Sequence, residues 1–296
     1  MNINFKDLVN VIVILMLSLL FAFFANPQFA IIENTPFFIL VMFSIYFIHW
    51  IVFLPSYIVQ TEKYFDITGT VAYLFSLLLS IYFLTKTQNI INVRSLTILI
   101  LIFVWSIRLG YFLFSRISRD KVDKRFTNLK KSFSKFFVTW TVSGMWVFIT
   151  SLNGLTVIIN NVSYFNDLFY VIGLAIWIIG FSIEVISDEQ KKRFKRNVEN
   201  KNKFISTGLW KFSRHPNYFG EMLIWIGISI ISFPTLTGFQ YLTLISPFFV
   251  IWLLINISGI NLLEEKADLK WGSVNSYIKY KKHTPVLIPF SKTFRS

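Results

Sequence analysis

The sequence predicts an all-α, polytopic membrane protein. Two observations lead to this fold class. Hydrophobic residues make up 54% of the 296 residues, and they fall into runs long enough to cross a bilayer, which takes about 20 residues in a helix. The stretches between these runs are too short to fold separately, so we expect a single membrane domain over residues 1–296.

About eight transmembrane helices are expected. The first run has features of a secretory signal, but Lys6 is offset by Asp7 and no clear small-residue cleavage site follows, so we expect it to stay as a helix. The eight runs lie at residues 8–25, 37–59, 68–85, 95–115, 137–159, 165–187, 217–233 and 239–260.

The charges predict an orientation. Residues 116–135, 187–216 and 261–296 together hold 24 of the 29 Lys and Arg residues, and eight helices place all three segments on one side. The positive-inside rule makes that side cytoplasmic, together with the N- and C-termini. Lys86 and Arg94 are the only misfits. Because topology accounts for the net charge of +14, we expect membrane lipids as partners and no nucleic acid.

Several site classes are excluded by what the sequence lacks. It contains no cysteine, which rules out disulfides, thiolate metal sites and a cysteine nucleophile. GxGxxG, Walker and HExxH motifs are also missing, so we expect no metal and none of the common soluble cofactor folds.

Ionisable residues inside the expected spans are rare in membrane proteins and usually functional. This chain has four of them, and the predicted topology places all four toward the cytoplasmic side. Such a set predicts a cavity open to the cytoplasm, as a substrate pocket or its support. The alternative is that Arg108 reaches the headgroups and Glu184 pairs with a neighbouring Lys or Arg. The four residues are His49, Arg108, Glu184 and Glu221.

A polar loop, PSYIVQTEKYFDITG at residues 55–69, lies between two expected spans. Tyr57, Tyr64 and Asp66 are candidates for hydrogen-bonding groups or acids that face a substrate. The structural alternative is that Asp66 or Thr68 is the N-cap of the next helix.

The stretch GLWKFSRHPNYFGE, residues 208–221, combines a helix start with polar side chains. Pro216 suits the first turn of a helix, whose free N–H groups favour an anion. Arg214 offers a planar fork suited to phosphate. A phosphate-bearing cofactor would satisfy this set, whereas the alternative is a helix cap with an interfacial aromatic anchor. The candidate cofactor residues here are Arg214, His215, Asn217, Tyr218 and Glu221.

The C-terminal tail holds a second polar cluster. Glu264 and Asp268 are four residues apart on a helix expected to end at Gly272, and their acidity opposes the positive-inside trend. A basic partner is therefore implied, either Arg214 or the lysines of residues 191–203. Tyr277 and Tyr280 would lie on a following helical turn. The alternative is an amphipathic helix that lies on the membrane.

These motifs resemble a known family. SRHPNYFGE, LLEEKADLKWG and TPVLIPF together are similar to steroid 5-alpha-reductase-like membrane proteins, and more narrowly to a subgroup long catalogued as a domain of unknown function. The resemblance covers most of the chain and is concentrated in residues 204–290. FDITG, SIRLG and DEQKKRFK fit the same pattern. More distantly, the R-H-P-x-Y core is shared with sterol reductases and isoprenylcysteine carboxyl methyltransferases.

The resemblance implies NADPH in a pocket in the cytoplasmic half of the fold and hydride transfer to an enone or olefin of a lipophilic substrate. It implies cofactor roles for Arg214, His215, Asn217, Tyr218 and Glu221. Glu264, Asp268, Tyr277 and Tyr280 are further cofactor candidates. Two alternatives stay open: a methyltransferase that binds S-adenosylmethionine, and a non-catalytic lipid-binding membrane protein. The host membrane would be the plasma membrane in a bacterium or the endoplasmic reticulum in a eukaryote.

Overall fold

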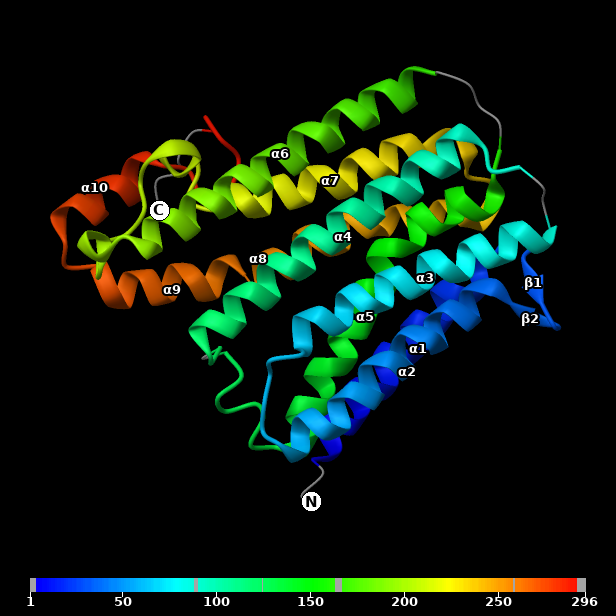
Figure 1. Cartoon of the computed structure of the whole chain (residues 1–296), viewed down its shortest axis with the longest axis horizontal. Coiled ribbons are helices and arrows are strands. Elements are labelled where there is room, and N and C mark those ends of the chain that lie inside the picture. The colour runs from blue at the N-terminus through cyan, green and yellow to red at the C-terminus, as the bar shows by residue number, and fades with distance from the viewer. Residues whose placement is uncertain (1–3, 88–89, 124, 163–166, 258, 292–296) are drawn as a thin grey trace. The chain divides into compact units, whose positions relative to one another are not determined.

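The computed structural model describes residues 4–87, 90–123, 125–162, 167–257 and 259–291 (Figure 1). In these ranges eight helical segments are long and apolar enough to cross a membrane, which confirms the predicted all-α fold class. The chain is therefore an integral, multi-pass membrane protein. The side on which each terminus lies stays a prediction.

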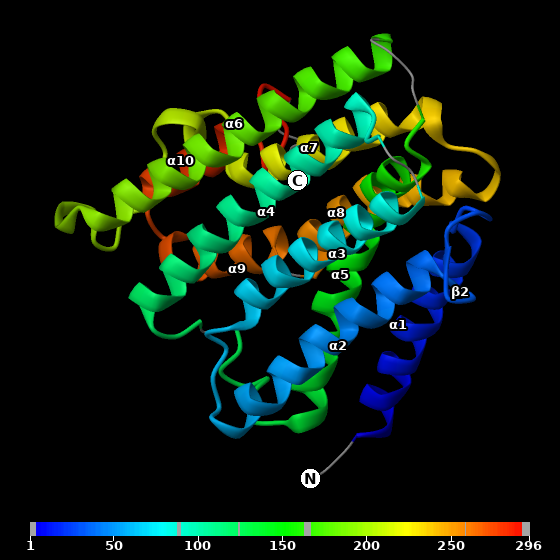
Figure 2. The same cartoon turned by 45° about the vertical axis from the view of Figure 1, so that its right-hand side comes forward.

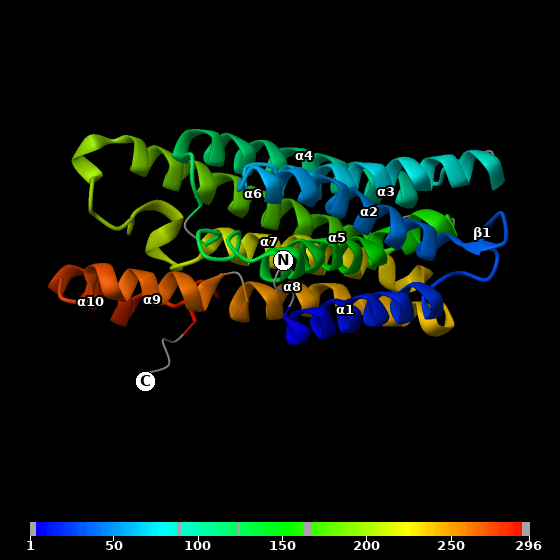
Figure 3. The ribbon, with the colours of Figure 1, turned by 90° about the horizontal axis from the view of Figure 1, so that it is seen from below.

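The helices follow one another in the order that the sequence predicts. A two-stranded hairpin, β1 (Ile31–Ile32) and β2 (Thr35–Pro36), joins the first two helices (Figure 3). The helices are α1 (Phe5–Phe24), α2 (Phe37–Ile58), α3 (Phe65–Thr87), α4 (Val93–Asp120), α5 (Phe133–Asn160), α6 (Leu168–Arg196), α7 (Pro216–Ser232), α8 (Ile245–Asn256), α9 (Ile260–Trp271) and α10 (Asn275–His283), with 3₁₀ turns at Val198–Asn200, Gly208–Lys211, Phe233–Thr235 and Gly238–Leu244.

Residue contacts divide the chain into two compact units. The N-terminal unit comprises Met1–Phe169 and Ser232–Ser246, and the C-terminal unit comprises Tyr170–Ile231 and Pro247–Ser296. That residues 1–296 form a single domain stays a prediction.

Helix α5 is the centre of the N-terminal unit. It packs against α1, α2, α3 and α4, and 78% of its most apolar stretch is buried (Figure 1). The outer helices keep large apolar side chains such as Phe47 and Leu78 on their outer faces, as expected where lipid is the solvent.

An aromatic cluster closes one end of this unit. Phe53, Phe126, Phe136 and Trp140 are buried together, and Phe65 packs against them. Their rings meet edge-on or tilted, with the Phe65 and Phe126 centroids 4.8 Å apart, a geometry that aromatic pairs favour. The cluster fixes the start of α3 against the α4–α5 connection.

Arg94, one of the two charge misfits, is explained by an ion pair. Its side chain is buried, and its Nη2 lies 2.7 Å from Oδ2 of Asp167. The carboxylate gives this buried cation a local counter-charge, and the orientation itself stays a prediction.

Glycines bring α6 and α7 together in the C-terminal unit, and the two helices run side by side (Figure 2). Gly180 and Gly220 face each other, and a Cβ atom on Gly180 would lie 2.7 Å from the carbonyl oxygen of Gly220. Gly173 and Gly227 make a second such approach, with 2.6 Å from a Cβ on Gly173 to the Gly227 oxygen. Small residues at both crossings let the backbones touch, as is common between membrane helices.

Several boundaries differ from those expected, and three of the differences bear on the polar segments. Helix α3 begins at Phe65, so Asp66 and Thr68 lie inside its first turn and the N-cap alternative for them is wrong. Helix α6 continues to Arg196 because its polar segment keeps helix-forming residues. The eighth span is interrupted: a 3₁₀ turn precedes α8, and α9 starts separately after Gly259.

Candidate functional site

Helix α7 begins at Pro216, as its sequence predicts. Ahead of it the chain makes a 3₁₀ turn whose first residue, Gly208, has a φ of +62°, a left-handed conformation that favours glycine. Trp210 follows and donates its indole N–H to the carbonyl of Ser187 at 3.0 Å. The turn therefore anchors the segment before α7 to α6.

Arg214 joins three parts of the C-terminal unit. Its Nη2 lies 2.8 Å from Oε2 of Glu264 in α9. Its Nη1 donates to the carbonyl of Lys281 at 2.7 Å and to that of Thr284 at 3.3 Å, at the end of α10. The predicted pairing of the α9 acids with Arg214 is thus confirmed for Glu264.

His215 shares the same carboxylate. Its Nε2 lies 2.8 Å from Oε1 of Glu264, and its ring stacks on that of Tyr218 with centroids 5.8 Å apart. Burial lowers the pKa of His215 below its usual value, and Lys191 and Arg214 lower it further, although Glu264 opposes this. A neutral ring must then carry its proton on Nε2, because an ionised Glu264 can only accept.

A second polar group ties α9 to α10. Asp268 accepts the Tyr277 hydroxyl at 2.9 Å, and the Lys281 ammonium at 2.6 Å. Burial and the nearby carboxylate raise the pKa of Tyr277, so its hydroxyl stays a donor. Tyr280 donates to the carbonyl of Trp210 at 2.6 Å, and burial likewise raises its pKa. Tyr277 therefore joins two successive helices, and Tyr280 joins segments 70 residues apart in the chain.

The TPVLIPF segment lies along the start of α7. The N–H of Arg214 donates to the carbonyl of Pro285 at 2.9 Å. The hydroxyl of Ser213, a fully buried side chain, donates to the carbonyl of Leu287 at 2.7 Å. These contacts bring together SRHPNYFGE and TPVLIPF, two of the three motifs on which the resemblance is based.

Two further predicted cofactor residues lie on α7. Asn217 is half-buried, and its side chain hydrogen-bonds to no residue that the structure describes. Glu221 is buried one turn further along. Gly220 beside it is used for helix packing, since a Cβ there would lie 3.0 Å from Cβ of the buried Glu184.

Asp66, a candidate catalytic residue of the N-terminal unit, lies at the edge of a charged cluster. The Nη2 of Arg116 is 3.6 Å from Oδ2 of Asp66 and 4.0 Å from Oδ2 of Asp123. The buried Glu62 accepts the Asp123 N–H at 2.7 Å and pairs with Lys130 at 2.7 Å. The cluster ties the polar loop to the α4–α5 connection.

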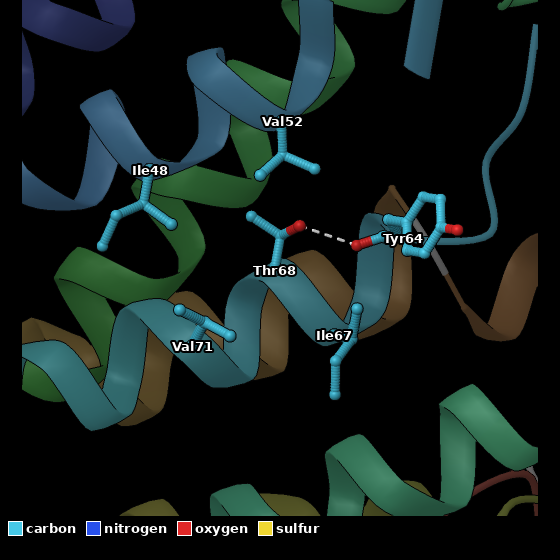
Figure 4. A pocket seen from close by; sticks show the side chains of 6 residues that line it. All are labelled: Ile48, Val52, Tyr64, Ile67, Thr68 and Val71. Atoms are coloured by element: carbon cyan, nitrogen blue, oxygen red, sulfur yellow. Dashed lines mark hydrogen bonds between the residues drawn. The ribbon is translucent and has the colours of Figure 1, made fainter. Parts of the chain in front are cut away.

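Tyr64 lines a pocket of about 180 Å³ between α2 and α3. Apolar side chains form most of it, and Figure 4 shows Ile48 and Val52 reaching from α2 toward Thr68 of α3. The Thr68 hydroxyl donates to the Tyr64 carbonyl at 2.7 Å (Figure 4). Tyr64 as a whole is 45% exposed.

Tyr57, His49 and Arg108 have packing partners in the N-terminal unit. The Tyr57 ring meets Phe133 edge-on at 5.1 Å, as part of the aromatic cluster. His49 is fully buried in α2, with Nδ1 2.8 Å from the carbonyl of Ile45 and Nε2 3.2 Å from the hydroxyl of Ser143. Arg108 lies over the ring of Phe112 at 5.2 Å.

Comparison with protein families identifies the chain. A family model described as a protein of unknown function (DUF1295) matches residues 49–284. The chain belongs to this family. The match begins in α2 and ends just after α10, so it contains both polar clusters of the C-terminal unit.

Two curated proteins are similar to this DUF1295 member. One is the 3-oxo-5-alpha-steroid 4-dehydrogenase 1 of Rattus norvegicus, 27% identical over 121 residues, which are 41% of this chain and 41% of that protein. The enzyme of the same name from Mus musculus is 30% identical over 63 residues, 21% of this chain and 25% of that protein. The similarity is therefore distant and partial. No solved structure matches the chain significantly.

Several residues of these clusters were missed by sequence reasoning. Lys281 and Arg116 belong to basic stretches in which many cations look equivalent, and only the folded contacts single them out. Ser213 and Ser143 are ordinary serines with no pattern around them. A basic partner for Asp268 was expected, but not one from α10.

Proposed function

We propose that this DUF1295 protein is a membrane-embedded, NADPH-dependent reductase of a lipophilic substrate, a steroid-like or other lipid with an enone or olefin. The observation that carries the proposal is the convergence of Arg214, His215 and Glu264 at the start of α7. The partial similarity to 3-oxo-5-alpha-steroid 4-dehydrogenase 1 supports the same chemistry.

The donor groups of the C-terminal unit fit an anionic cofactor. NADPH would supply a hydride when bound. Arg214 and His215 stand just before α7, where a helix start favours phosphate. The Nε of Arg214 is buried without a hydrogen-bond partner among the described residues, which is consistent with a missing anion. Asn217, whose side-chain amide makes no hydrogen bond to the described residues, and Tyr218 would extend the contact along the first turn of α7.

The N-terminal unit offers the acid that such a reduction requires. Hydride addition to an enone leaves an enolate, which needs a hydrogen-bond donor and then a proton at carbon. Tyr64 lines an apolar pocket with its hydroxyl directed away from the other lining residues (Figure 4), and Asp66 lies two residues before that pocket's Thr68 and beside Arg116. Tyr57 is the third candidate, but its ring packs in the aromatic cluster.

A paired titration tests the proposal. Purified full-length protein is melted with NADPH and, separately, with S-adenosylmethionine. NADPH at about 100 times its Kd is expected to stabilise the protein by about 2.7 kcal/mol, and S-adenosylmethionine by none. Arg214→Ala should abolish the shift. Lys211→Ala, a change at an exposed cation three residues away, should keep it.

Other outcomes decide against the reductase. Stabilisation by S-adenosylmethionine alone would identify a methyltransferase. Stabilisation by neither compound would support a lipid-binding protein without catalysis, and Arg214→Ala would then change only the melting temperature of the free protein.

A further inference from the structure

Glu264 occupies the face of Arg214 and His215 that an anion would take. One carboxylate oxygen lies 2.8 Å from Nη2 of Arg214, and the other lies 2.8 Å from Nε2 of His215. Arg214 and His215, which precede α7, thus both bind the same side chain of α9. A carboxylate so placed resembles a bound anion more than a surface ion pair.

The guanidinium of Arg214 still has an unused donor. Its Nε is buried and makes no hydrogen bond to any part of the chain that the structure describes. Nε and Nη2 form the edge of the fork that binds carboxylate or phosphate through two oxygens. Glu264 uses only Nη2 of this edge, because its second oxygen is turned to His215.

The remaining nitrogen of the fork holds Arg214 in place independently of Glu264. Nη1 donates to the carbonyls of Lys281 and Thr284 at 2.7 and 3.3 Å. If Glu264 left, the Nε–Nη2 edge would keep its direction. A terminal phosphate group has three free oxygens, one for each of Nε, Nη2 and the His215 N–H, whereas a carboxylate has two. Phosphate therefore matches this donor set better than Glu264 does.

We propose that Glu264 is a built-in competitor for the phosphate of the cofactor. It fills the Arg214–His215 site while no ligand is bound, and a phosphate binds there by displacing it. The inference rests on the proposed function and adds the regulation of the same site. A buried guanidinium without a counter-charge is costly, so the competitor also keeps the free protein folded.

Displacement needs only a side-chain movement. Glu264 is the most exposed of the three groups, with 18% of its side chain accessible against 10% for Arg214 and 7% for His215. Asp268, one turn further along α9, is held by Tyr277 and Lys281 of α10. That second contact keeps α9 docked after Glu264 releases its partners.

The experiment compares Glu264→Gln with Glu265→Gln, an exposed neighbour on the same helix. Kd values for NADPH and for inorganic diphosphate are measured on the full-length protein. Glu264→Gln removes the negative charge and is expected to bind both probes about tenfold more tightly, equivalent to about 1.4 kcal/mol. Glu265→Gln should match the wild type. Unchanged or weaker binding by Glu264→Gln would overturn the proposal.

The two probes separate this inference from the proposed function. If Glu264→Gln binds diphosphate more tightly but no variant binds NADPH, NADPH is not the cofactor, and the role of Glu264 as a competitor for phosphate stands. If the protein binds NADPH but Glu264→Gln does not bind it more tightly, NADPH stands as the cofactor and Glu264 is not a competitor. Binding of neither probe to any variant overturns both.

A second variant covers a failure of Glu264→Gln to fold. Glu264→Asp keeps the charge, but its shorter side chain cannot reach Arg214 and His215 together, so tightening by about threefold is expected. Unchanged or weaker binding by this variant also overturns the inference.

Discussion

The two units satisfy their polar side chains with different proportions of local and long-range hydrogen bonds. In the N-terminal unit many hydroxyls bond to a carbonyl one turn earlier in the same helix, as Ser76 does to Ala72 and Thr156 does to Leu152. In the C-terminal unit polar groups join segments far apart in the chain, as Tyr280 does to Trp210. Local bonds only make a polar residue tolerable inside a helix, whereas long-range bonds build a defined arrangement.

The difference indicates where function is expected. Contacts among three or four separate segments fix the positions of side chains more precisely than one helix alone does. Binding sites need such precision. The N-terminal unit also has long-range contacts, among them the charged cluster of Glu62, Asp66, Arg116 and Lys130 and the hydrogen bond from Asn153 to Thr243. Under the proposed function, cofactor binding belongs to the C-terminal unit and the candidate acid to the N-terminal unit.

The largest expected effect is on stability, and it tests how tightly the helices pack inside each unit. Gly180→Ala places a Cβ 2.7 Å from both the Gly220 oxygen and Cβ of Leu223, so α6 and α7 must separate, with a loss of about 3 kcal/mol. Gly69→Ala in α3 meets only Val147 at 3.7 Å and should be neutral or slightly stabilising. Melting both variants in the same detergent checks this. Similar losses would remove the contrast between the units.

The next effect tests the division of roles. Asp66→Asn is expected to lower kcat about a hundredfold if Asp66 provides the acid, while the Kd for NADPH stays the same. Arg214→Ala should weaken NADPH binding instead. Steady-state kinetics with a lipid enone, together with NADPH titrations, separate the two changes. If Asp66→Asn and Arg214→Ala both change only kcat, or both change only the Kd for NADPH, the two residues do not have the separate roles proposed for them.

Much of the fold was predictable because its signals are local. The eight apolar runs gave the spans, Pro216 gave the start of α7, and Gly272 gave the end of α9. The predicted turn after α9 is confirmed by α10, which carries Tyr277 and Tyr280. These features depend on one helix at a time, so periodicity and end signals suffice to find them.

The candidate site was predictable only in part. The pairing of Arg214 with an α9 acid followed from the excess of carboxylates on a basic side, but the choice of Glu264 required the phase of α9 against α7. The contacts of Ser213 and Arg214 with residues 285–287 involve backbone carbonyls, which carry no sequence signal. The start of α3 was expected at residue 68 but lies at Phe65, because polar residues precede the apolar run, so Asp66 falls inside the helix.

The smallest expected effect is the contribution of His215 to the pH dependence of stability. Burial lowers the pKa of His215, with Lys191 and Arg214 adding to this and Glu264 opposing it, so the unfolded chain takes up a proton at a higher pH than the folded one. The stability due to a neutral His215 is therefore complete above pH 6.5, the ordinary value for histidine, and declines as the pH falls from there to the folded pKa. Chemical denaturation between pH 7.5 and 5 should show this decline, and His215→Gln should reduce it because the amide stays neutral. His283→Gln, a change at an exposed site on α10, serves as the control. A decline that is identical in all three proteins would show that the His215–Glu264 contact forms no part of the arrangement that distinguishes this unit.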